Sequence, residues 1–135
     1  MDVDAFLSTT RQGVLLTVAD DGSADGVPVW FDWDGTHVRF FCSAGSPKTR
    51  RMAKDPRVSM LVMNNLDEAP EWVRFEGRVE LAEQESAKEL ALDVLAPRYW
   101  DVTDPDIAEY LEGWRQSPDD AMVVYRFAPD RIRTS

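Results

Sequence analysis

Apolar residues recur at every second position, or form short β-branched runs, through much of the chain. This period predicts a mainly β protein. The alternation is clearest in WVRFEGRVEL at residues 72–81, where it predicts a strand with one face in water. Gly77 inside this segment predicts a bulge or a close approach of another backbone. The predicted strands are residues 14–19, 27–33, 36–42, 57–64, 72–81 and 121–127, with a further short one at 131–134.

Turn residues separate the predicted strands. DDGSADG at residues 20–26 is rich in turn formers, and Asp34-Gly35 is a strong hairpin signal. Pro28 has no N–H to donate, so the strand at 27–33 is expected at a sheet edge or to open locally. Successive hairpins with few helices predict a closed or nearly closed antiparallel barrel with helices outside. Its interior is too small for a ligand, which is expected on the outer wall or between subunits.

Helical signals are fewer. Ser46 is a good N-cap and Pro47 suits a first helical turn, so a helix is predicted to begin there. It is expected to end near Asp55, because Pro56 follows. The other predicted helices are residues 1–8, an apolar stripe at 87–96 that ends in a break from residue 97, and a segment capped by Thr103 or Asp104.

Length and composition predict one soluble domain, residues 1–135. With 25 acidic and 15 basic residues the net charge is −10, which disfavours nucleic acid or anionic membranes as partners. Cys42 is the only cysteine and His37 the only histidine, so a disulfide, a zinc site or a histidine-based triad is not expected. The lack of a signal-peptide or membrane-span pattern favours a cytoplasmic protein.

A cationic island interrupts this acidic chain. Residues 47–57 hold five basic residues against one acidic residue, a local net charge of +4. A helix N-terminus attracts anions, and Lys48 in the first turn is unfavourable for the helix dipole alone, which favours an anionic partner. Ser43 and Ser46 add hydroxyl groups beside it. Two interpretations are open at this point: a phosphate cradle, or a solvated basic helix face.

The order of these pieces resembles a known family. GVPVWFDWDGTHVRFFCSAGSPKTRRMAKDPRVSMLV followed by WVRFEGRVEL is similar to the split-barrel flavoproteins related to pyridoxamine 5′-phosphate oxidase, which include the coenzyme F-420-dependent oxidoreductases. The similarity covers residues 13–81, and is weaker at 121–132. It implies a six-stranded antiparallel split β-barrel of the FMN-binding type. It also implies a homodimer, with FMN or the deazaflavin coenzyme F-420 in a groove at the subunit interface.

The resemblance assigns roles to particular residues. The backbone at the predicted edge strand would lie along the ring, the end of the next strand would approach the phosphate or ribityl chain, and the helix start would hold the phosphate. The implied contacts are Val27, Pro28, Val29 and Trp30 for the ring, Cys42 and Ser43 for the chain, and Ser46, Lys48 and Thr49 for the phosphate, while Arg50 and Arg51 are further candidates, most useful if the cofactor carries an acidic tail. Trp72 stands where the family's namesake oxidase usually has a flavin-binding glutamine. It is expected either to stack on or close the pocket, which resembles the deazaflavin branch more, or to contact the second subunit of the implied dimer.

The function implied by this resemblance is a flavin- or deazaflavin-dependent oxidoreductase. Hydride would pass between the cofactor ring and a small organic substrate, and no catalytic side chain is assigned. The ending YRFAPDRIRTS lacks the oxidase's substrate signature, which argues against vitamin B6 oxidation. The alternative is a non-catalytic cofactor-binding or haem-handling protein.

The tryptophans are expected to divide between two environments. Strict alternation puts Trp30 and Trp33 on opposite faces of one strand, so Trp33 is predicted in the core and Trp30 beside the groove. Tyr99 and Trp100 lie near the predicted helix break, and are weighed as contacts to a partner subunit.

Overall fold

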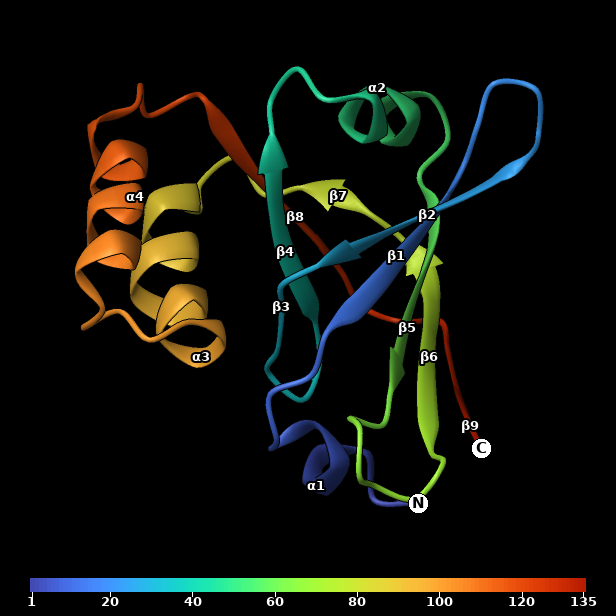
Figure 1. Ribbon diagram of the computed structural model, residues 1–135. Helices are drawn as coiled ribbons and strands as arrows, with labels where there is room; N and C mark the ends of the chain where they lie inside the picture. The colour runs from blue at the N-terminus through green and yellow to red at the C-terminus, as the bar shows by residue number, and fades with distance from the viewer.

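The computed structural model describes residues 1–135 and has two antiparallel sheets with helices at the periphery (Figure 1). The first sheet has the strand order β2-β1-β5-β6-β9, and the second has the order β3-β4-β8-β7. The strands are β1 Gly13–Val18, β2 Ala24–Val29, β3 Phe31–Trp33, β4 Val38–Ser43, β5 Arg57–Met63, β6 Trp72–Arg78, β7 Glu80–Leu81, β8 Met122–Phe127 and β9 Arg131–Thr134. The mainly β prediction is confirmed, and the predicted count of six strands is wrong, because nine are present.

Two of the additional strands arise from breaks in predicted strands. The segment 27–33 leaves the first sheet after Val29 and enters the second at Phe31, so it forms both β2 and β3. Val29 and Phe31 are both buried, so the period of two continues across the break and carries no sign of it. The segment 72–81 divides in the same way at the buried Val79. The third addition, β9, is the predicted short strand at 131–134.

The position of Pro28 follows its chemistry. β2 pairs only with β1 and is therefore an edge strand, as the missing N–H of Pro28 predicts. A cluster of 16 buried residues fills the space between the two sheets. Phe40, Phe75 and Phe127 are the largest fully buried side chains in it. The barrel interior is therefore a packed core, and any ligand site lies outside it.

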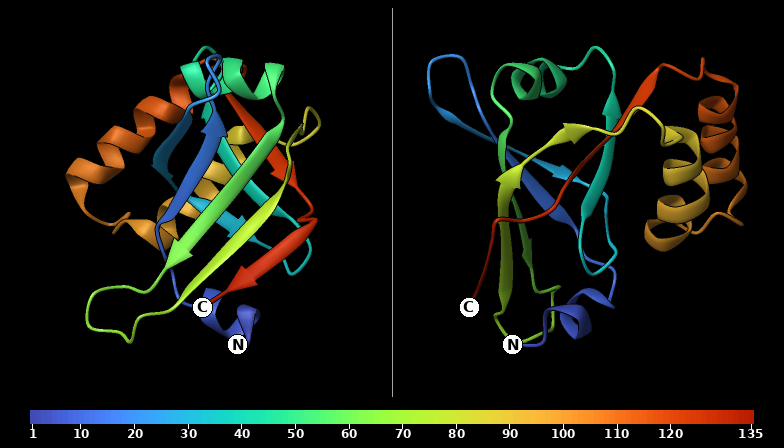
Figure 2. Two further views of the ribbon diagram at one scale, coloured as in Figure 1. Left: turned by 90° about the vertical axis from the view of Figure 1, so that its right-hand side faces the viewer. Right: turned by 180° about the vertical axis from the view of Figure 1, so that it is seen from behind.

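The helices cover the barrel unevenly. Their bounds are α1 Val3–Leu7, α2 Pro47–Lys54, a π-helix η1 Glu89–Leu95, α3 Ala96–Tyr99 and α4 Pro105–Gln116. α3 and α4 lie against the outer face of the second sheet, and α2 covers one end of the barrel (Figure 1). No helix lies in front of the outer face of the first sheet (Figure 2, left). None of the helices is both long and apolar enough to span a membrane.

The predicted helix caps are largely confirmed. The hydroxyl of Ser46 caps α2, and the carboxylate of Asp104 accepts hydrogen bonds from two backbone N–H groups at the start of α4. The break predicted at residue 97 is wrong, because the chain stays helical to Tyr99. Pro97 lies just after the point where the π-helix η1 passes into α3.

Gly77 provides a test of the packing between the sheets. A Cβ at this position would lie 2.9 Å from a ring carbon of Phe127 and 3.3 Å from the carbonyl oxygen of Ala128, so the predicted close approach is confirmed. We expect Gly77→Ala to lower the free energy of unfolding by about 1–3 kcal/mol, as overpacking does. The matched control is Gly113→Ala in helix α4, where a Cβ would meet no atom within 4 Å. This change should raise the free energy of unfolding by about 0.5–1 kcal/mol. Urea unfolding measures both, and equal shifts for the two variants would contradict this packing.

Candidate functional site

The start of α2 is tied to the end of β4 by a chain of hydroxyl contacts. The Ser46 and Thr49 hydroxyl oxygens are 2.8 Å apart, and the Thr49 hydroxyl donates to the carbonyl of Ser43 at 2.9 Å. The backbone N–H of Thr49 also donates to the Ser46 hydroxyl, at 3.4 Å. Both predicted phosphate-binding hydroxyls therefore already have partners within the chain, and their main role is to fix the first turn of α2.

Two groups at this helix start have no such partner. The backbone N–H of Lys48 makes no hydrogen bond within the chain, and its half-buried side chain forms no ion pair with a carboxylate. Arg50 donates from Nη1 to the carbonyl of Gly45 at 2.9 Å and also lacks a carboxylate partner. Lys48 and Arg50 therefore present uncompensated positive charge beside an open helix N-terminus, which is an arrangement suited to an anion.

The other three basic residues of the island are compensated by carboxylates. Arg51 lies 2.7 Å from Asp25, Lys54 lies 3.2 Å from Asp20, and Arg57 lies 2.6 Å from Asp55. Hydrogen bonds from Arg57 lower the pKa of Asp55 to about 2, so this carboxylate is ionised at neutral pH. Arg51, which the resemblance implies as a further candidate for an acidic cofactor tail, is thus engaged in joining α2 to β2.

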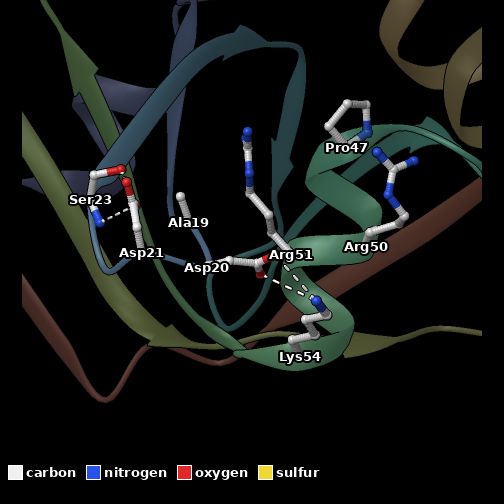
Figure 3. A pocket seen from close by; sticks show the side chains of 8 residues that line it. All are labelled: Ala19, Asp20, Asp21, Ser23, Pro47, Arg50, Arg51 and Lys54. Atoms are coloured by element: carbon white, nitrogen blue, oxygen red, sulfur yellow. Dashed lines mark hydrogen bonds and ion pairs between the residues drawn. The ribbon is translucent and has the colours of Figure 1, made fainter.

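A cavity of about 420 Å³ separates α2 from the turn between β1 and β2. Figure 3 shows the Arg51 side chain reaching into this space, and Lys54 directed at Asp20 across it. The lining residues are Ala19, Asp20, Asp21, Ser23, Pro47, Arg50, Arg51 and Lys54. The cavity is therefore bounded by cations on the helix and by acids on the turn.

β2 extends from this charged end toward the helix layer. The side chains of Val27 and Val29 pack on the barrel core, whereas Pro28 is exposed on the outer face. Only the backbone of the two valines can meet a ligand outside the barrel, and the prediction assigned them that contact. One of these backbone groups is already used, because the carbonyl of Val29 accepts a hydrogen bond from Gln12 at 3.1 Å.

Trp30 lies where the chain crosses between the sheets. Its ring stacks on Tyr99 with centroids 5.1 Å apart, and contacts Trp100 and Trp114 edge-on or tilted at 4.7 and 5.9 Å. These contacts place the Trp30 side chain beneath the layer formed by α3 and α4. Trp33 points to the opposite face and lies 4.7 Å from Phe75 in the core, as predicted.

Tyr99 joins the two sheets, which the sequence does not reveal. Its hydroxyl donates to the carbonyl of Arg11 at 2.6 Å, just before β1, and accepts the N–H of Phe31 in β3 at 3.4 Å. Burial raises the pKa of Tyr99, so the phenol remains protonated and its proton is held in this bond. Tyr99 is therefore a structural link between the sheets.

The buried carboxylate of Asp32 anchors an ion-pair network between the second sheet and α3. Its carboxylate oxygens lie 2.6 Å from Arg39 and 2.8 Å from Arg98. Burial alone would raise the pKa of Asp32, but the hydrogen bonds from Arg39 and Arg98 outweigh it, and the pKa is lowered. Asp32 and Arg39 are cross-strand partners beside the hairpin, so register could have predicted this pair but not Arg98.

Trp72 lies on the open outer face of the first sheet. It lines a cavity of about 380 Å³ with Met63 and Arg74, and the Arg74 guanidinium is 5.6 Å from its ring. Pro28 faces the same side, but β6 is three strands from β2, a separation of about 14 Å. A single copy of the chain therefore does not bring Trp72 and Pro28 to the same point.

Cys42 and Ser43 face in different directions. The thiol of Cys42 is 3% exposed, points into the core and lies 3.3 Å from the Thr49 hydroxyl, while Ser43 is exposed. The side chain of Cys42 is thus placed to support α2, and Ser43 is the member of this pair that a ligand can reach.

Burial raises the pKa of the Cys42 thiol, which predicts a chemically silent cysteine. We expect the folded protein at pH 8 to react with a water-soluble disulfide reagent at least about 100 times more slowly than the same protein in urea. Absorbance of the released thiolate measures both rates. A rapid reaction of the folded protein would place Cys42 at the surface, contrary to this geometry.

Comparisons with known proteins identify the fold and the family. The chain matches the family described as pyridoxamine 5′-phosphate oxidase over residues 2–135. A comparison with curated proteins found no match.

Solved structures share the architecture at low sequence identity. An F420 reductase has a TM-score of 0.77 and 23% identity, covering 98% of this chain and 97% of its own. A candidate pyridoxamine 5′-phosphate oxidase from Listeria innocua has a TM-score of 0.71 and 22% identity, and the match covers 98% of this chain and 94% of its own. The heme storage protein HutZ from Vibrio cholerae has a TM-score of 0.67 and 19% identity, and the match covers 98% of this chain and 91% of its own. These likenesses agree on the fold, and the family match covers nearly the whole sequence, so the chain belongs to the pyridoxamine 5′-phosphate oxidase family.

Proposed function

We propose that this protein is an oxidoreductase that binds FMN or the deazaflavin coenzyme F-420 and transfers hydride between the ring and a small organic substrate. The observation that carries the proposal is the state of Lys48. Its ammonium group and its backbone N–H both lack partners at the start of a capped helix, in a chain of net charge −10. A phosphate group satisfies both donors and the helix dipole at once.

The residues present fit a phosphorylated ring. Lys48, its backbone N–H and Arg50 would hold the phosphate, while Ser46 and Thr49 keep the first turn of α2 in place. The backbone of β2 around Pro28, on a free sheet edge, would orient the ring. The bound cofactor supplies the redox chemistry, and the protein supplies binding, orientation and a shaped pocket.

We further propose a homodimer that forms over the outer face of the first sheet. This face has no covering helix and carries the exposed Met63, which is 52% accessible, beside Trp72 and Leu61 (Figure 2, left). Because Trp72 lies about 14 Å from β2 in its own subunit, the Trp72 that closes the pocket would come from the partner. Apolar side chains on an uncovered sheet face favour such an association.

A haem-handling role has less support. Haem iron usually requires an axial protein ligand. The single histidine, His37, lies next to the β3–β4 hairpin turn, where its backbone N–H donates to Asp34 at 2.6 Å. Nothing at α2 suits iron, whereas two unpaired cations there suit a phosphate.

A titration with each cofactor tests the proposal. We expect at least one of the two to bind, and Lys48→Ala to weaken that binding by about 1.5–3 kcal/mol, roughly 10- to 150-fold, the range for a charge-assisted hydrogen bond. The matched control is Lys54→Ala on the same helix, which removes the same charge from an exposed pair with Asp20 and should change the FMN affinity less than about twofold. Cofactor fluorescence gives the dissociation constants.

Two results would overturn this assignment. One is the absence of binding by both cofactors at millimolar concentration, particularly if haemin binds with a sharp absorption band. The other is an unchanged affinity in Lys48→Ala, which would move the phosphate away from the start of α2.

A further inference from the structure

The cavity between α2 and the β1–β2 turn is close to electrically neutral, although its helix wall is strongly basic. Its cations are Arg50, Arg51 and Lys54. Asp20 pairs with Lys54, and Asp25 pairs with Arg51. Asp21 is the second carboxylate of the lining and forms no ion pair, although, besides the hydrogen bonds from Ser23, the nearby charge of Arg51 helps to lower its pKa.

Asp21 is held in its ionised form by the turn itself. Its carboxylate accepts hydrogen bonds from the hydroxyl and the backbone N–H of Ser23, at 2.6 and 2.9 Å. These bonds lower the pKa of Asp21. Figure 3 shows Asp20 on the turn side of the cavity facing Lys54 of α2, and Asp21 on the same turn with its carboxylate directed at Ser23.

The charge available to a ligand is therefore limited to the helix start. Lys48 and Arg50 are the two members of the island without a carboxylate partner. A phosphate monoester carries a charge of about −1.5 to −2 at neutral pH, which these two cations balance. A ligand that continues beyond its phosphate along α2 would enter this cavity, where the remaining cations Arg51 and Lys54 are already paired with Asp25 and Asp20 and where Asp21 repels further negative charge.

We propose that Asp20 and Asp21 select a cofactor that ends at its phosphate, FMN, against coenzyme F-420, whose phosphate continues into an acidic tail. This inference rests on the proposed function and names the ligand class for the same site. The discrimination arises from a repulsive element, since Asp20 neutralises the cation that a tail carboxylate would use and Asp21 opposes the tail directly.

The test compares three probes on wild type and Asp20→Asn/Asp21→Asn: FMN, F-420, and a deazaflavin 5′-phosphate without the acidic tail. Asparagine keeps the side-chain oxygen that accepts the Ser23 bonds, so the turn is preserved. We expect wild type to bind both tail-less phosphates at least about tenfold more tightly than F-420. The Asp20→Asn/Asp21→Asn variant should bind F-420 at least about fivefold more tightly than wild type does, while its affinity for FMN stays within about twofold of the wild-type value. The gain in F-420 affinity should be smaller in about 0.5 M salt, which screens the charges.

The matched control is Asp119→Asn/Asp120→Asn, which makes the same change in net charge in the loop before β8. It should leave all three affinities within about twofold. F-420 binding wild type as tightly as FMN, with no change in the Asp20/Asp21 variant, would overturn the inference and leave the proposed cofactor site standing. Failure of all three probes to bind wild type and variant would overturn the proposed function, and the inference with it.

Discussion

The seating of α2 by one apolar side chain, Met52, determines the geometry of the candidate site. Met52 is 3% exposed and belongs to the core cluster between the sheets, and burial of such a side chain contributes about 1.5–3 kcal/mol. Side chains four residues apart lie on the same side of a helix, so Lys48 is held over the end of the barrel. Arg51 and Lys54 then face β2 and its turn, where Asp25 and Asp20 pair with them.

A second constraint keeps the two sheets in a fixed relation. The crossing at Trp30 is covered by aromatic side chains from the helix layer, and the Tyr99 hydroxyl bonds the N–H of Phe31 in β3 and the carbonyl of Arg11 just before β1. The edge strand β2 is consequently fixed at both ends, by Arg51 at one and by the aromatic cluster near the other. A rigid strand edge of this kind is a suitable backbone surface for orienting a planar ring.

Local signals in the sequence predicted the parts of this arrangement that depend on neighbouring residues. The Ser46 cap, the helix end before Pro56 and the edge position of Pro28 each follow from the chemistry of one or two side chains. The break at Trp30 was not predictable, because the buried residues on both sides of it keep the same period. The hydroxyl of Tyr99 contacts a carbonyl 88 positions earlier, and no local pattern encodes that contact.

The same limit applies to the charges. In the sequence, residues 47–57 carry a net charge of +4. In the fold, Asp25 neutralises Arg51 from 26 positions away along the chain, and Asp20 neutralises Lys54 from 34 positions away. Folding thus concentrates the available positive charge at Lys48 and Arg50. The resemblance assigns the phosphate to this helix, and the structure indicates which of the helix's basic residues lack a carboxylate partner.

A crystal structure of the protein with FMN tests the central claim most directly. We expect the phosphate within hydrogen-bond distance of the Lys48 ammonium and its backbone N–H, with the ring along β2 and Trp72 of a second copy closing the groove. Density for FMN elsewhere, with the start of α2 facing empty solvent, would contradict the account.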